Sequence, residues 1–205
     1  MRILELFAGS RSIGKEAELL GMEVFSSDIN QFDGINYAVN ILEFDYSKIP
    51  FVPDIIWASP PCTGFSVASI GHHWGGGKGA YIPKTDTAKL GIELVKKTLE
   101  IIDYYKPKYW FMENPRGVLR KMDIVKDLKI NTVTYCQYGD ERMKPTDIWT
   151  NSDVWIPKNM CKNGDSCHIA APRGSKTGTQ GRSNAYERSK IPVELCQEIL
   201  KSCIC

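Results

Sequence analysis

Short apolar runs and helical patterns alternate along most of this chain, and few folds are compatible with that alternation. Apolar runs that predict strands lie at residues 3–7, 22–27 and 54–58, with a weaker one at 37–42. Helical patterns follow them at residues 13–20, which Gly21 closes, and at residues 87–105. The alternation predicts an α/β fold with a mostly parallel sheet and helices on both faces.

The later part of the chain continues the pattern. Strands are predicted at residues 109–112, 132–136 and 147–150, and a closing helix is predicted at 192–203 with proline at its start. The long helix at 87–105 is expected to bury one face, made of Leu90, Leu94, Thr98, Ile101 and Ile102. Residues 67–85 are rich in glycine and histidine and predict a mobile active-site loop.

Length and composition indicate an ordinary globular chain. Its 205 residues fit one domain, and 42% of them are hydrophobic. We find no apolar run long enough for a membrane span and no signal-peptide pattern, so the seven cysteines favour a reduced, cytoplasmic setting. The net charge of +2 says little about partners, but basic residues crowd the last third and predict a phosphate-facing or merely solvated surface. They are Lys144, Lys158, Lys162, Arg173, Lys176, Arg182, Arg188 and Lys190.

Chemically capable residues lie at the ends of the predicted strands, where α/β sheets bind ligands. Cys62 follows one strand in the sequence Ser59-Pro60-Pro61-Cys62, where the prolines hold the turn rigid. Glu113 ends another apolar strand, so partial desolvation favours its protonated form. A glycine-containing turn follows the first strand, and Asp28 ends the second, placed to bind ribose hydroxyls. The sequence therefore predicts a nucleophile, an acid and a nucleotide-like cofactor site.

The motifs together resemble the DNA cytosine-5 methyltransferase family, in particular its compact phage-type members. Leu4-Glu5-Leu6-Phe7-Ala8-Gly9 is similar to the first family motif, Ser59-Pro60-Pro61-Cys62 to the nucleophile motif, and Phe111-Met112-Glu113-Asn114 to the Glu-Asn motif. The resemblance implies a Rossmann-like fold that uses S-adenosylmethionine and acts on double-stranded DNA. Cys62 would attack C6 of a cytosine flipped out of the duplex, Glu113 would protonate N3, and Asn114 would hold the turn around Cys62.

The resemblance also implies a cofactor site. Phe7, Gly9 and Ser10 would line its methionine end, and Asp28 would bind the ribose. Ile29 stands where the family often has a stacking aromatic, and Asn40-Ile41 where it usually has an Asp-Ile pair that reads the adenine amino group. The remaining walls are expected to be Pro60 and Leu94.

The chain departs from the family pattern at three places. Arg11 replaces the second glycine of the first motif, although a helix can still start at Ser12. The arginine motif is altered, so that either Arg142 or Lys144 would contact the cytosine O2. Only residues 151–187 stand where the family has a target-recognition domain, between a catalytic core at 1–150 and a closing segment at 188–205. Either base contacts come from this short segment, for instance from the loop at 174–181, or the target sequence is short and relaxed and that loop is a flexible surface loop.

Some alternatives stay open. Cys161, Cys167 and His168 have a spacing unlike that of usual zinc ligands, and free thiols, with no metal, are favoured over a zinc site. The rival functions are an RNA (tRNA) cytosine-5 methyltransferase, a catalytically silent DNA-binding relative, and a thiol enzyme that uses His72 or His73. The expected oligomeric state is a monomer.

Overall fold

A mixed, mostly parallel sheet forms the centre of the computed structural model, which describes residues 1–76, 79–170 and 185–204. In these residues one sheet has the strand order β3-β2-β1-β4-β7-β9-β8. Its strands are β1 (Arg2–Leu6), β2 (Glu23–Asp28), β3 (Tyr37–Ala38), β4 (Ile55–Ala58), β7 (Tyr109–Pro115), β8 (Ile130–Thr134) and β9 (Pro145–Thr150). The expected loop at 174–181 and the cations Arg173, Lys176 and Arg182 lie outside the described residues.

Strand direction confirms the predicted fold class. β1 pairs in parallel with both β2 and β4, and β4 pairs in parallel with β7. β9 runs antiparallel to its two neighbours, β7 and β8. The chain therefore has a Rossmann-like α/β fold in which β1, β4 and β7 point their carboxyl ends toward the same edge of the sheet.

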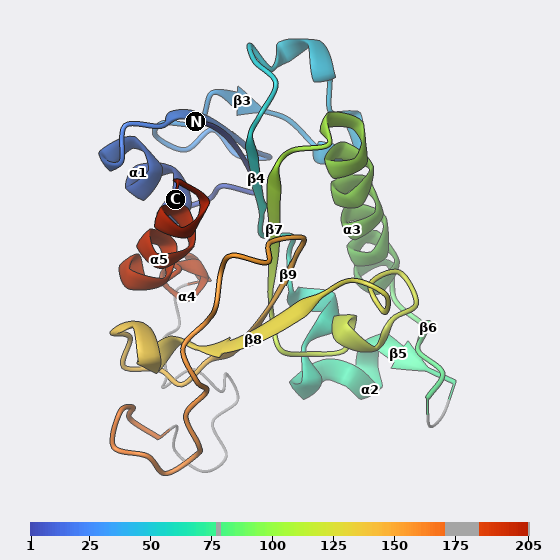
Figure 1. Cartoon of the computed structure of the whole chain (residues 1–205). Helices are drawn as coiled ribbons and strands as arrows, with labels where there is room; N and C mark the ends of the chain where they lie inside the picture. The colour runs from blue at the N-terminus through green and yellow to red at the C-terminus, as the bar shows by residue number, and fades with distance from the viewer. Residues whose placement is uncertain (77–78, 171–184, 205) are drawn as a thin grey trace.

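Helices cover both faces of the sheet (Figure 1). α1 (Ser12–Leu19) and α5 (Val193–Ile204) lie side by side on one face, and α3 (Asp86–Tyr105) lies on the other. Leu195 and Ile199 of α5 belong to the apolar core on the first face, whereas Leu94 and Ile101 of α3 belong to the core on the second. Burial of these two faces from water is the main force that holds the layers together.

The ends of the helices follow from local chemistry. α1 begins at Ser12, as expected, although Arg11 before it takes a left-handed φ of 55°. α3 begins after Thr85, whose hydroxyl accepts a hydrogen bond of 3.2 Å from the Ala88 amide. The expected face of α3 is wrong at Leu90, which is 49% exposed, because the buried stripe runs through Ala88 and Gly91 instead.

The structure differs from the sequence prediction in two segments: one contains more secondary structure than expected, and the other contains less. Residues 67–85 contain α2 (Ile70–His73) and a hairpin of β5 (Trp74–Gly75) and β6 (Ile82–Pro83), rather than the long loop expected. Its buried anchor is Trp74, whose Nε1 donates to the Gly64 carbonyl at 2.7 Å. The expected strand at 37–42 shortens to β3, because the Asn40 side chain caps a 3-10 turn at Ile41–Glu43.

The chain after β9 packs partly into the core instead of standing apart from it. Trp155 is buried among the core residues beneath α5, and its Nε1 donates to Glu198 at 3.0 Å. α4 (Ala185–Ser189) then leads into α5. Among the described residues, no helix has the length and apolar character needed to cross a bilayer.

Candidate active site

The backbone around Cys62 is held by both neighbouring strands. The Ser59 amide donates to the Leu6 carbonyl of β1 at 3.3 Å, and Asn114 Nδ2 of β7 donates to the Pro60 carbonyl at 2.8 Å. The second contact is the one expected for Asn114, whose side chain is buried. Cys62 itself begins a 3-10 turn at Thr63–Phe65. The thiol therefore stands at the carboxyl end of β4 on a turn with little freedom.

Glu113 lies on the strand beside that turn. In the register of β4 with β7, Ala58 is paired with Met112, so Glu113 is one residue beyond the end of β4. The Glu113 side chain is 5% exposed, and its Oε1 accepts a hydrogen bond of 3.1 Å from the Tyr135 hydroxyl. Tyr135 is fully buried directly after β8, and no motif or spacing pointed to it as a site residue.

A lysine completes the group. Lys144 Nζ lies 4.5 Å from the centre of the Tyr135 ring and donates to the Arg188 carbonyl at 3.1 Å. Burial lowers the pKa of Lys144, and the charges of Glu113 and Cys62 oppose that effect. Its backbone φ of 27° is unusual for a residue with a side chain.

Electrostatics connects these side chains to Cys62. The Cys62 residue reaches solvent. Partial burial of the thiol is the main cause that raises its pKa, and the Glu113 carboxylate raises it further. The Lys144 charge lowers the pKa of the thiol. Each of the three groups thus acts on the protonation of another. Cys62, Glu113 and Lys144 form one coupled site at the carboxyl ends of β4 and β7.

Arg142, the alternative to Lys144, has another partner. Its guanidinium pairs with the Asp140 carboxylate, and Nε lies 2.8 Å from Asp140 Oδ1. That hydrogen bond is the main cause of the raised pKa of Arg142. Lys144, which was also expected on a basic surface, is half-buried and packs over the Tyr135 ring. Of the surface cations, Lys158 pairs with Glu194 and Lys190 with Glu187.

A pocket with about 370 Å³ of empty space opens beside this group. It lies at the carboxyl ends of β1 and β2 and is lined by Phe7, Ser27, Asp28, Ile29, Val39, Asn40, Ile41, Pro61 and Leu94. Six of these were expected at a cofactor site: Phe7, Asp28, Ile29, Asn40, Ile41 and Leu94. Ile29 is 67% exposed at the rim. One wall of the pocket is Pro61, the residue directly before Cys62.

Three expected cofactor residues do not line the pocket. The Gly9 amide donates to Asp28 Oδ2 at 2.9 Å, so Gly9 holds the Asp28 carboxylate in place. The Ser10 hydroxyl lies 2.8 Å from the Ser12 hydroxyl. The Pro60 carbonyl accepts a hydrogen bond from Asn114, and Pro61 rather than Pro60 lines the pocket. Contact of Gly9, Ser10 and Pro60 with a cofactor stays a prediction.

Glu5 is a buried carboxyl group whose role the sequence did not suggest. It lies beneath the start of α1 and accepts hydrogen bonds from the Ile13 and Gly14 amides and from the Ser26 hydroxyl. Burial outweighs these bonds and raises the pKa of Glu5 to about 7. Glu5 therefore supports the turn between β1 and α1 from inside the protein.

The histidines of residues 67–85 do not join the thiol. His73 is buried, and its Nδ1 lies 2.7 Å from Thr85 Oγ1. His72 packs against the His73 ring, with 4.8 Å between the ring centres. Within the described residues, no hydrogen bond joins either side chain to Cys62. The arrangement of a Cys-His thiol enzyme is therefore not found here.

Comparison with known proteins gives one family. The sequence model for C-5 cytosine-specific DNA methylases matches residues 1–138. The probable DNA (cytosine-5)-methyltransferase of Frog virus 3 (isolate Goorha) is 31% identical over 220 residues, which cover 99% of this chain and 100% of that protein. A solved putative DNA modification methyltransferase encoded within an E. coli prophage is 17% identical with a TM-score of 0.53. That match covers 83% of this chain but 57% of the other, and it concerns the fold alone.

Proposed function

The chain belongs to the C-5 cytosine-specific DNA methylase family, and we propose that it methylates C5 of cytosine in DNA through a covalent bond between Cys62 and C6. The observation that carries this mechanism is the coupling of Cys62 to Glu113 and Lys144 at two adjacent strand ends. A thiol, a carboxyl group and a cation in one place match the three demands of the reaction: attack at C6, protonation at N3 and neutralisation of charge.

The residues of the pocket fit S-adenosylmethionine. Its lining is mostly apolar, as an adenine ring requires, and Asp28 offers a carboxylate to ribose hydroxyls. When bound, the cofactor supplies the methyl group. Asn40 would hydrogen-bond the adenine amino group through its oxygen, which also accepts a bond of 3.2 Å from the Leu42 amide. Pro61 and Phe7 would hold the methyl-bearing end near Cys62.

The proposed steps begin at Cys62. The thiol loses its proton to the solvent that Cys62 reaches, and the sulfur forms a bond to C6 of a cytosine turned out of the duplex. Glu113 donates a proton to N3, so that the electrons displaced from C6 make C5 nucleophilic. After C5 is methylated, a base removes its proton, the bond between sulfur and C6 breaks, and N3 returns its proton to Glu113. Cys62 is restored as 5-methylcytosine leaves.

The charges of the free site resist this reaction, and substrate binding would relieve them. The Glu113 carboxylate raises the pKa of Cys62, so a charged Glu113 disfavours the thiolate. When Glu113 holds the proton that N3 receives, that repulsion is absent, the Lys144 and Arg188 charges still favour the thiolate, and burial still opposes it. Lys144 is thus the better candidate for contact with the cytosine O2, since the Arg142 guanidinium is paired with Asp140.

We also propose separate roles for three segments of the chain. Residues 1–150 would form the catalytic core, residues 151–187 would replace a target-recognition domain, and residues 188–205 would close the core. Packing of α5 against α1 supports the last assignment, for example through Gln197 Nε2 and Glu16 at 2.8 Å. Burial of Trp155 means that the first part of 151–187 also supports the core.

Methyl transfer to defined substrates tests the function. The purified chain is incubated with cofactor carrying a labelled methyl group and with either duplex DNA or tRNA. We expect label in duplex DNA as 5-methylcytosine and none with the Cys62→Ala variant. Label in tRNA alone would identify an RNA enzyme instead, and no label in either would indicate a silent relative. Bisulfite mapping of DNA from cells that express the chain would then give the target sequence.

A further inference from the structure

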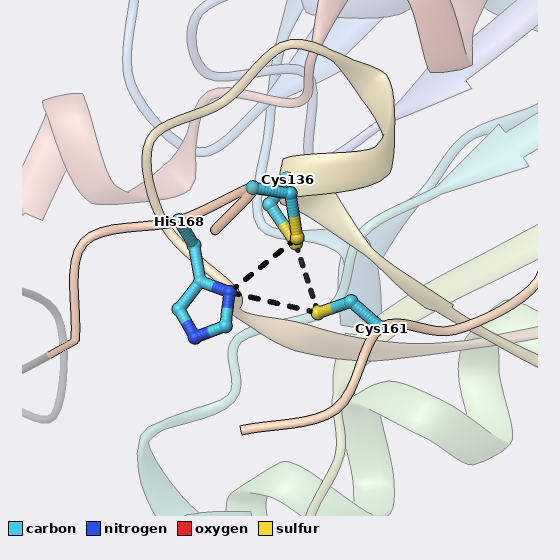
Figure 2. A group of neighbouring side chains, drawn as sticks. Cys136, Cys161 and His168 are labelled. Atoms are coloured by element: carbon cyan, nitrogen blue, oxygen red, sulfur yellow. Dashed lines mark hydrogen bonds between the residues drawn. The ribbon is translucent and has the colours of Figure 1, made fainter. Parts of the chain in front are cut away.

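Four potential metal ligands lie together in a group that shares no residue with the proposed active site. Cys136 lies in the 3-10 turn after β8, and Cys161, Cys167 and His168 lie in the chain after β9. The three sulfur atoms and one imidazole nitrogen all lie within 4.8 Å of one another. Figure 2 shows the Cys136, Cys161 and His168 side chains pointing toward a common centre from separate segments.

The distances between ligand atoms fit a tetrahedral ion. Zinc bound at about 2.3 Å from sulfur and about 2.1 Å from nitrogen keeps its ligand atoms about 3.6–3.8 Å apart. Here the His168 Nδ1 atom lies 3.7 Å from Cys161 Sγ and 3.6 Å from Cys167 Sγ. Cys136 Sγ lies 3.6 Å from Cys167 Sγ and 3.1 Å from Cys161 Sγ. One ion between the four atoms would require only small shifts of side chains.

The backbone around the cluster is already held in place. The Cys161 amide donates to Thr134 Oγ1 at 3.0 Å, and the Ile169 amide donates to the Glu141 carbonyl at 3.0 Å. Between them the chain turns back through a hydrogen bond of 2.7 Å from the Lys162 amide to Asp165. The segment is thus tied at one end to β8 and at the other to the connection between β8 and β9.

The donor set itself indicates which ion would bind. We propose that Cys136, Cys161, Cys167 and His168 bind one zinc ion, with the three cysteines as thiolates and the histidine through Nδ1. Soft thiolates and an imidazole are the ligands of structural zinc sites, and four protein ligands leave no position open for catalysis. Each thiol gives up its proton when the ion binds. Gln137 Nε2, 3.4 Å from Cys167 Sγ, supplies a donor to that sulfur.

The geometry of the cluster explains why the spacing of these residues in the sequence favoured free thiols over a metal site. Cys167 and His168 are adjacent, which is unusual for two ligands of one ion, but Nδ1 is the imidazole nitrogen nearer the backbone and reaches the same centre. Cys136 is 25 residues from Cys161, so only the fold brings it close. The ion would fasten the chain that follows β9 to the end of β8. It would thereby hold residues 161–168 beside the strand that leads to Tyr135.

Metal content of the full chain tests the proposal. The protein is purified under reducing conditions, without chelators and without a metal-affinity step, and its zinc is measured by elemental analysis. We expect about one zinc ion per chain, and less than a tenth of that in Cys167→Ser and in His168→Ala. Cys203→Ala is the matched control, because Cys203 is a buried thiol in α5 outside the cluster, and it should retain the ion. A wild-type chain without zinc that also takes up none would overturn the proposal.

A second measurement separates metal binding from misfolding. Zinc is removed from the folded wild-type chain and replaced by Co²⁺, whose absorption spectrum reports tetrahedral thiolate ligands. We expect those bands in the wild type and in Cys203→Ala, and a melting temperature that falls on chelation and recovers when zinc is added back. A spectrum without thiolate bands, or a disulfide between Cys136 and Cys161 in the freshly purified protein, would contradict the site. Neither result depends on methyl transfer.

Discussion

The Tyr135 hydroxyl donates a hydrogen bond of 3.1 Å to the Glu113 carboxylate, and the face of the same ring lies 4.5 Å from Lys144 Nζ. One buried side chain therefore contacts both the proposed acid and the proposed cation. It connects β7, which carries Glu113, to the residues before β9, which carry Lys144. Tyr135 is a positioning residue in this account, since it acts through Glu113.

Removal of that hydroxyl should slow methyl transfer without weakening cofactor binding. A hydrogen bond to a charged group contributes about 1.5–3 kcal/mol, so Tyr135→Phe is expected to lower the single-turnover rate about 10–100-fold. Tyr138→Phe is the matched control, because the Tyr138 hydroxyl donates to Glu198 of α5 at 3.0 Å and not to Glu113. Equal rates for Tyr135→Phe and the wild type, with equal affinity for S-adenosylhomocysteine, would refute the positioning role.

The coupled charges predict opposite effects of two substitutions on the Cys62 thiol. Burial and the Glu113 charge raise the pKa of Cys62 above its ordinary value of 9.0, and Lys144 lowers it. The thiolate should therefore form at lower pH in Glu113→Gln and at higher pH in Lys144→Met. Iodoacetamide alkylation of the Cys62 peptide, measured by mass spectrometry across a pH series, gives the midpoints. Two midpoints that move in the same direction would contradict the coupling.

An aromatic substitution at the exposed rim of the pocket should increase affinity for the cofactor. Ile29 is 67% exposed beside Asp28, and an aromatic ring there could stack on adenine. Such stacking contributes about 0.5–1.5 kcal/mol, so Ile29→Phe should tighten binding of S-adenosylhomocysteine about 2–10-fold, and Ile29→Ala should weaken it. Calorimetric titration measures both. Val52→Ala, at an exposed position away from the pocket, should leave affinity unchanged.

Glu5 predicts a loss of stability as pH rises. Its pKa is about 7 in the folded chain against an ordinary value of 4.5, so the folded state binds the proton more tightly. This contribution to the free energy of unfolding is complete below about pH 4.5 and is lost as pH rises through 7. Its size is at most about 3 kcal/mol.

The matching experiment compares urea unfolding of the wild type and Glu5→Gln at pH 5 and at pH 7.5. Because glutamine stays neutral, the variant should gain stability relative to the wild type as pH rises. Glu43→Gln, a substitution at an exposed carboxylate, should show no such change. A constant difference between wild type and Glu5→Gln at the two pH values would rule out a buried titrating carboxyl group.

Local patterns were enough to predict the framework of the site. The apolar runs before Asp28, Cys62 and Glu113 are strands in the structure. Asp28 ends β2 and Cys62 follows β4, whereas Glu113, where a strand was expected to end, lies within β7, which continues two residues further to Pro115. The long helix was also predicted nearly to its ends. Its buried face was not, because the side of α3 that meets the sheet is set by packing, which leaves Leu90 exposed.

Contacts between segments far apart in the chain could not be predicted from the sequence. Tyr135 and Glu113 are 22 residues apart, and no spacing rule joins a tyrosine after one strand to a glutamate on another. The same holds for Cys136 and Cys161, whose closeness follows from the turn after β8. The partners of the two cations could not be predicted either, since only the fold reveals that Arg142 pairs with Asp140 while the Glu113 charge acts on Lys144.

Covalent trapping tests the central claim most directly. Duplex DNA that carries 5-fluorocytosine at a mapped target site has no proton to lose from C5, so the bond between sulfur and C6 cannot be released after methylation. With S-adenosylmethionine present, the wild type should form a denaturation-resistant complex whose cross-linked peptide contains Cys62, and Cys62→Ala should form none. A cross-link at another residue, or methyl transfer that persists in Cys62→Ala, would contradict the account.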